Sequence, residues 1–169
     1  MLKQLKKSLD KGLETVTALV MGLLVLDVVW QVITRFVLKN PSNWTEELAT
    51  YLLIWVGLLG AGVALRRRAH LGIDYFVLRL DPKSQLISAV IAALFVTVFA
   101  VAVLLVGGIQ LVSLTFKLGQ TAPATGIKLG YVYLAVPISG FFIVMYGLEI
   151  LAEAMAKLNQ LKKRVRNLI

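Results

Sequence analysis

Cysteine is absent from the sequence, and histidine occurs once, at His70. Without cysteine the chain has no disulfide bond, no thiolate metal site and no cysteine nucleophile. One histidine excludes a zinc site built from several histidines. The P-loop, Gly-x-Ser-x-Gly and His-Glu-x-x-His motifs are absent as well. We therefore expect no catalytic site and no cofactor in this chain.

Acidic residues are also scarce: 9 Asp and Glu stand against 18 Lys and Arg, which leaves a formal net charge of +9. Such a balance in a soluble protein raises the question of nucleic acid. Here the basic residues cluster beside apolar segments, without a recognition motif or interleaved aromatic residues. We expect anionic lipids, and no nucleic acid, as the partners of these charges.

Long apolar segments dominate what is present. Hydrophobic residues make up 59% of the chain, against about 45–50% in soluble domains. They gather into four blocks, each able to supply the ~20 residues that cross a bilayer. The first block runs on to Leu38 without a cleavage site, so we expect it to be retained. The pattern predicts an all-α integral membrane protein, a single membrane domain over 1–169 with transmembrane helices at 13–38, 44–65, 86–116 and 129–151.

The third block holds 31 residues, more than a bilayer requires. A helix of that length must tilt, project into water or bend. Gly107 and Gly108 are adjacent within it, and paired small residues are a recurrent cause of helix kinks. These glycines are therefore the place where we expect a bend.

Lysine and arginine are divided unequally between the two sides that four spans create. The N-terminal tail, the connection between spans two and three and the C-terminal tail hold 14 of them, whereas the opposite side holds Lys39, Lys117 and Lys128. Basic residues accumulate on the cytoplasmic side of membrane proteins. We therefore expect a bacterial inner-membrane protein with both termini in the cytoplasm.

Three amphipathic segments border the spans, at 2–12, 70–81 and 152–168, with apolar residues spaced by three and four. Helices of this kind lie at the cytoplasmic interface with their apolar face in lipid. The third segment is also compatible with packing on a partner helix. Its pattern covers under three heptads, which favours the lipid interface.

The first span carries polar residues on one helical face: Asp27, Gln31, Thr34 and Arg35. An ionisable residue in a membrane costs at least ~2.5–3.5 kcal/mol on insertion scales. We therefore predict that this polar seam faces protein, either other helices of this chain or a partner subunit. Arg35 alone is also explained by reaching the nearby outer interface. An ion or proton pathway through Asp27 stays open as an alternative.

The second span opens with Asn43, followed by Glu46 and Glu47. Asn43 and Glu46 have the spacing of a capping box, which predicts a helix start at this point. Either glutamate is also placed to meet Arg35 near the outer surface.

Small residues recur later in the second span, where Gly57 and Ala61 are four positions apart. Small residues at this spacing let membrane helices approach closely. We predict contact between a larger membrane subunit and spans one and two, through Asp27, Gln31, Arg35, Gly57 and Ala61.

Basic residues follow the second span directly, and we predict that Arg66, Arg67 and Arg68 anchor the chain at the cytoplasmic interface. His70 and Asp74 lie one helical turn apart in the same segment. A lone histidine is more often a hydrogen-bonding structural group than a catalyst. We therefore assign His70 and Asp74 to the same interface.

Several motifs occur in a characteristic order between about Leu13 and Leu151. They are Arg35, Trp44-Thr45-Glu46-Glu47, Gly60-Ala61, Arg67 with His70 and Asp74, Thr121-Ala122-Pro123-Ala124, and Tyr133-Leu134-Ala135-Val136-Pro137 with Gly140. Their order and spacing resemble the small membrane subunit of tripartite ATP-independent periplasmic (TRAP) transporters, the DctQ type. Ser139 before Gly140 departs from the pattern, and Asp27 receives no role from the resemblance.

The resemblance implies a subunit that pairs with a large DctM-type membrane subunit, which carries the substrate and sodium by an elevator-like motion. It also implies that a periplasmic substrate-binding protein delivers an organic acid, for which a C4-dicarboxylate and sialic acid both stay open. The small subunit then braces the large one and helps to dock the binding protein. The external charges expected at the docking surface are Lys39, Glu46, Glu47, Lys117 and Lys128.

Two other classes are weighed against this interpretation. An intramembrane or lipid-modifying enzyme needs polar groups at one depth, whereas Asp27, Gln31 and His70 lie at different depths. A free-standing small transporter needs an alternating-access core, and the two halves of the chain show no internal repeat that supports one.

Overall fold

The computed structural model describes residues 2–40, 42–67 and 81–166, and its regular elements there are helices. Apolar side chains at nearly every position of the spans make the helix the available structure, because it satisfies the backbone hydrogen bonds internally. The elements are α1 (Leu2–Phe36), α2 (Asn43–Arg66), α4 (Pro82–Phe99), the π-helix η1 (Ala100–Gly107), α5 (Gly108–Lys117), α6 (Leu129–Tyr133) and α7 (Ala135–Arg166).

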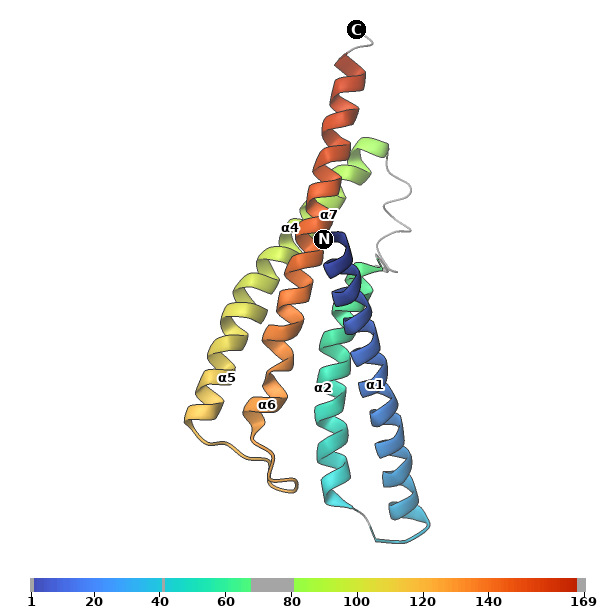
Figure 1. The fold of residues 1–169 in the computed structure, drawn as a ribbon, viewed down its shortest axis with the longest axis vertical. Helices are drawn as coiled ribbons and strands as arrows, with labels where there is room; N and C mark the ends of the chain where they lie inside the picture. The colour runs from blue at the N-terminus through green and yellow to red at the C-terminus, as the bar shows by residue number, and fades with distance from the viewer. Residues whose placement is uncertain (1, 41, 68–80, 167–169) are drawn as a thin grey trace.

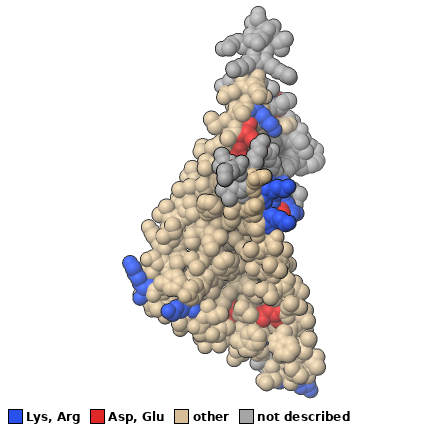
Figure 2. Space-filling view, viewed as in Figure 1, with Lys and Arg blue, Asp and Glu red and all other residues tan. Residues whose placement is uncertain are grey.

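Four helical segments are long and apolar enough to cross a membrane, and this confirms the predicted number of spans. The third is built from α4, η1 and α5 in succession, and the fourth from α6 and α7. Charged side chains gather toward the two ends of the molecule, and a wide uncharged band separates them (Figure 2). The segments are Lys6–Phe36, Asn43–Arg66, Lys83–Lys117 and Leu129–Gln160.

The helices form two hairpins that meet at one end and spread apart at the other (Figure 1). One hairpin is α1 with α2, and the other is the α4–η1–α5 rod with α6 and α7. The beginning of α1 and the end of α7 lie toward the end where the hairpins meet, opposite the α1–α2 and α5–α6 loops (Figure 1). The core sits where α2 and α7 cross, around Leu13, Leu59, Leu65, Ala100, Ile143 and Tyr146.

The third span changes helix type where a bend was expected. The wider π-helix ends at Gly107, and the α-helix resumes at Gly108, both with ordinary right-handed backbone angles. A Cβ on Gly108 would lie 2.9 Å from Cγ1 of Val136, so the missing side chain lets α7 pack closely here. The helix type therefore changes at the two glycines, and a bend of the third span at this place stays a prediction.

Two local predictions need revision. The N-cap of α2 is Ser42, not Asn43, which is already the first helical residue. Thr45 donates its hydroxyl hydrogen to the backbone oxygen of Ser42 at 2.7 Å, and the Ser42 side chain makes no cap hydrogen bond. The expected capping box fails because the chain enters the helix one residue earlier than its spacing requires.

The two terminal amphipathic segments are continuous with the spans they border. Residues 2–12 belong to α1, and residues 152–166 belong to α7, without a helix boundary. Their position at a lipid interface stays a prediction. The middle segment, with His70 and Asp74, lies outside the described residues apart from Asp81, and so does Arg68 before it.

Candidate functional site: the two polar ends of the bundle

An ion-pair cluster joins α1 to the end of α2 where the two hairpins meet. Arg66 places Nε 3.2 Å from Oδ2 of Asp10 and Nη1 2.8 Å from Oε1 of Glu14. Arg67 donates to the same Glu14 oxygen from Nη2 at 3.0 Å and from Nε at 3.2 Å. Asp10 and Glu14 are one turn apart on α1, so the antiparallel α2 brings its last two arginines opposite both carboxylates.

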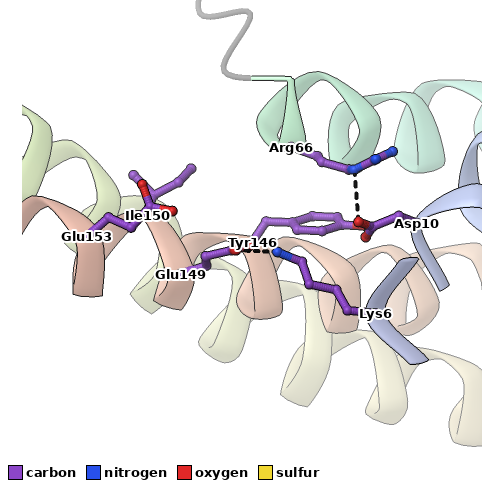
Figure 3. Close-up of a pocket in the computed structure, with 7 residues that line it drawn as sticks. All are labelled: Lys6, Asp10, Arg66, Tyr146, Glu149, Ile150 and Glu153. Carbon is purple, nitrogen blue, oxygen red and sulfur yellow. Dashed lines mark hydrogen bonds and ion pairs between the residues drawn. The ribbon is translucent and has the colours of Figure 1, made fainter. Parts of the chain in front are cut away.

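The fourth span closes this cluster from the other side. Tyr146 of α7 is 1% exposed and donates its hydroxyl hydrogen to Oδ1 of Asp10 at 2.8 Å. Lys6 of α1 pairs with Glu149, one turn further along α7. Figure 3 shows Lys6 and Arg66 reaching from separate helices toward the carboxylates around Tyr146. Three helices therefore meet through complementary charges.

A cavity of about 270 Å³ lies beside these contacts. It is lined by Lys6, Asp10, Arg66, Tyr146, Glu149, Ile150 and Glu153. The lining mixes both signs of charge, and the described residues hold no group of three or more His, Cys, Asp or Glu that could bind a metal ion. The ion pairs and the hydrogen bond of this cluster hold α1, α2 and α7 together, because a charge pair in a partly buried place is costly to separate. We call the cluster the clasp; it consists of Lys6, Asp10, Glu14, Arg66, Arg67, Tyr146 and Glu149.

Sequence reasoning missed most of the clasp. Arg66 and Arg67 were expected to anchor the chain at the cytoplasmic interface, which stays a prediction, and their pairing with carboxylates of α1 was not foreseen. A usable signal was present: Asp10 and Glu14 are acidic residues one turn apart in an otherwise basic segment. Tyr146 gave no signal, because its partner lies 136 positions away.

The opposite end holds the residues expected at the docking surface. Lys39, Glu46, Lys117 and Lys128 are all exposed there, on or beside the two loops at that end (Figure 1). Glu47 differs, because Oε2 of its half-buried side chain accepts hydrogen bonds from the backbone nitrogens of Ala124 and Thr125. The two distances are 3.1 and 2.7 Å.

The residues of the polar seam of α1 differ in exposure. Asp27 is 8% exposed, Thr34 is buried and Gln31 is half-buried, whereas Arg35 is exposed. Oδ2 of Asp27 is buried without a hydrogen-bond partner among the described residues. No ion pair in that part of the chain joins Arg35 to Glu46 or Glu47. The seam is therefore mostly internal to the α1–α2 hairpin.

The predicted small pair of α2, Gly57 and Ala61, is open to the outside, whereas Gly62 of the same helix is buried. Gly57 and Ala61 are both exposed, and a Cβ on Gly57 would meet no other described residue within 4 Å. Packing within this chain therefore gives no reason for a glycine at position 57.

Comparison with known proteins places the chain in one family. The model of the DctQ component of tripartite ATP-independent periplasmic transporters matches residues 24–157. The sialic acid TRAP transporter small permease protein SiaQ of Vibrio cholerae is 31% identical over 150 residues, covering 88% of this chain and 84% of that protein. A putative TRAP transporter small permease protein of Haemophilus influenzae is 29% identical over 148 residues, covering 86% and 88%.

A longer relative matches part of the chain. The isethionate TRAP transporter permease protein DctMQ of Oleidesulfovibrio alaskensis is 31% identical over 96 residues, covering 57% of this chain and 15% of that protein. The family match includes at least part of each of the four long segments, together with Glu46, Glu47 and the α5–α6 loop. The chain therefore belongs to the DctQ family, as a multi-pass small permease subunit of a TRAP transporter.

Proposed function

We propose that this subunit is a static brace, held beside a large DctM-type transport subunit through the outer surface of α1 and α2. The observation that carries the proposal is the exposure of α1. Within its most apolar stretch of 18 residues, only 6% are buried by the rest of the chain, against 33% in the corresponding stretch of the fourth span. A helix so little covered by its own chain offers its length to other molecules, and small residues on the neighbouring α2 allow a close approach.

The longer relative supports a lasting pairing. Its printed name, DctMQ, combines those of the DctM and DctQ subunit types, and the part similar to this chain makes up only 15% of its length. A small permease joined to a larger one in a single polypeptide fits a one-to-one complex. In the proposed interface, Arg35, Gly57 and Ala61 contact the partner. Asp27 and Gln31 support that surface from the side facing α2.

The proposal includes the surroundings of the complex. The clasp end lies in the cytoplasm of a bacterium with both termini, where the basic residues meet anionic lipids of the inner membrane. The loop end faces the periplasm and helps to dock a substrate-binding protein. Sodium and an organic acid, a C4-dicarboxylate or sialic acid, bind to the large subunit, and this chain holds no cofactor.

Single-cysteine crosslinking tests the brace, and the chain has no native cysteine to remove. Gly57→Cys and Ala61→Cys are each expected to crosslink to the large subunit in native membranes. Phe95→Cys on α4 is the matched control, because Phe95 is 71% exposed on the other hairpin. Crosslinks from position 95 alone, or transport by this chain without any partner in liposomes, contradict the brace.

A further inference from the structure

A side chain from one hairpin holds the external loop of the other. Oε2 of Glu47 on α2 accepts hydrogen bonds from the adjacent backbone nitrogens of Ala124 and Thr125. Hydrogen bonds to an ionised acceptor are roughly twice as strong as those between neutral groups. Glu47 is therefore a direct link between α2 and the α5–α6 loop.

The loop that Glu47 holds is closed on itself. The backbone nitrogen of Ala122 donates to the oxygen of Ile127 at 2.8 Å, and Thr121 and Lys128 form an antiparallel bridge. Ala122 is 2% exposed. Because the loop is closed internally, fixing it at Ala124 and Thr125 fixes the direction of the whole loop, including Lys128.

The remaining charges at this end are mostly positive. Arg35, Lys39, Lys117 and Lys128 are exposed, and none of them takes part in an ion pair within the described residues. Glu46 is an exposed acidic residue there, while the charge of Glu47 is directed at two backbone nitrogens. A surface of this sign is complementary to an acidic one.

The two lysine-bearing loops belong to hairpins that spread apart at this end (Figure 1). We infer that Glu47 is a positioning residue: by holding the α5–α6 loop against α2, it places Lys117 and Lys128, at the two ends of that loop, as one cationic platform for an acidic surface of the periplasmic binding protein. The inference rests on the proposed docking of that protein. A platform ordered before the encounter lowers the entropy cost of binding.

The first test measures the loop itself, with the full chain and its large subunit in nanodiscs. Glu47→Ala is compared with Glu46→Ala. The control removes an equal negative charge from the neighbouring position, where the glutamate side chain is exposed. Backbone hydrogen exchange at Ala124 and Thr125 is expected to become about tenfold faster in Glu47→Ala. It is expected to stay unchanged in Glu46→Ala. Equal exchange in both variants overturns the positioning role, whatever happens in docking.

The second test measures association of the same complexes with the substrate-binding protein of the same transporter. Glu47→Ala is expected to weaken association, and Glu47→Gln to restore part of it, because the amide oxygen still accepts a hydrogen bond. Glu46→Ala is expected to keep or strengthen it. Lys128→Glu is expected to weaken association and to flatten its dependence on salt.

The outcomes separate the two claims. If the complex without substitutions does not bind the binding protein, the proposed docking is wrong, and the inference about the platform is wrong as well. If the unchanged complex binds, while Glu47→Ala binds equally well or Lys128→Glu binds better, docking stands and the inference is overturned.

Discussion

The hydroxyl of Tyr146 on α7 lies 2.8 Å from a carboxylate oxygen of Asp10 on α1, and so joins two helices from different hairpins. Apart from this clasp, α1 packs along α2. Nε of Arg66 on α2 lies 3.2 Å from the other carboxylate oxygen of Asp10. A single buried carboxylate thus connects three of the four spans.

Removal of the tyrosine hydroxyl tests this connection. Tyr146→Phe is expected to lower the free energy of unfolding in detergent micelles by about 1.5 kcal/mol, the low end for a hydrogen bond to a charged group. Tyr131→Phe is the control, because Tyr131 is 55% exposed. Equal effects of the two substitutions show that the hydroxyl of Tyr146 does not stabilise the fold.

A double-mutant cycle shows whether the clasp acts as a unit. Asp10→Ala is expected to cost more than Tyr146→Phe, because it leaves the partly buried Arg66 without one of its two carboxylates. Adding Tyr146→Phe to Asp10→Ala is then expected to cost almost nothing further, so the coupling equals the cost of Tyr146→Phe alone, about 1.5 kcal/mol. Fully additive losses in the same unfolding titration contradict direct contact.

The close approach of α7 to the π-helix is a separate contribution to stability. A Cβ on Gly140 would lie 2.8 Å from Cβ of Leu104 and 3.1 Å from its backbone carbon. Gly140→Ala is therefore expected to destabilise the chain by about 1–3 kcal/mol. Gly60→Ala in α2 is the control, since nothing lies within 4 Å of the added methyl group. Unchanged thermal stability of Gly140→Ala indicates that the two helices separate easily.

The proposed orientation in the membrane rests on the charge asymmetry and is open to direct labelling. Lys39→Cys and Lys117→Cys are expected to react with a membrane-impermeant maleimide added outside spheroplasts. Ser8→Cys, on the exposed N-terminal part of α1, is expected to react only after the membrane is permeabilised. Labelling of position 8 from outside, with protection at 39 and 117, reverses the proposed orientation.

Much of the fold is readable from the sequence, and the misses are local. The four spans were predicted because hydropathy is a property of neighbouring residues. The cap was placed on Asn43 because the capping motif leaves the starting residue ambiguous by one position, and the structure selects Ser42. The π-helix was not foreseen, because its apolar residues, Ala100 to Gly107, carry no signal that separates it from an ordinary α-helix.

The candidate site was less predictable than the fold. Glu46 and Glu47 were both expected at the docking surface, yet only Glu47 reaches the nitrogens of the α5–α6 loop among the contacts of the described residues. Arg66 and Arg67 looked like lipid anchors, and the structure pairs them with α1. In both cases the partner lies more than 50 positions away in the chain.

The sequence by itself determined that the chain is a four-span membrane protein of the DctQ family, because hydropathy and motif order need no knowledge of distances between helices. Only the tertiary structure decided which charged side chains have a partner within the chain, and which partner each one has. Asp10 meets Tyr146, and Glu47 meets the loop at Thr125, because two hairpins cross at one end and diverge at the other. That crossing depends on side-chain packing between distant segments, which no local pattern in the sequence records.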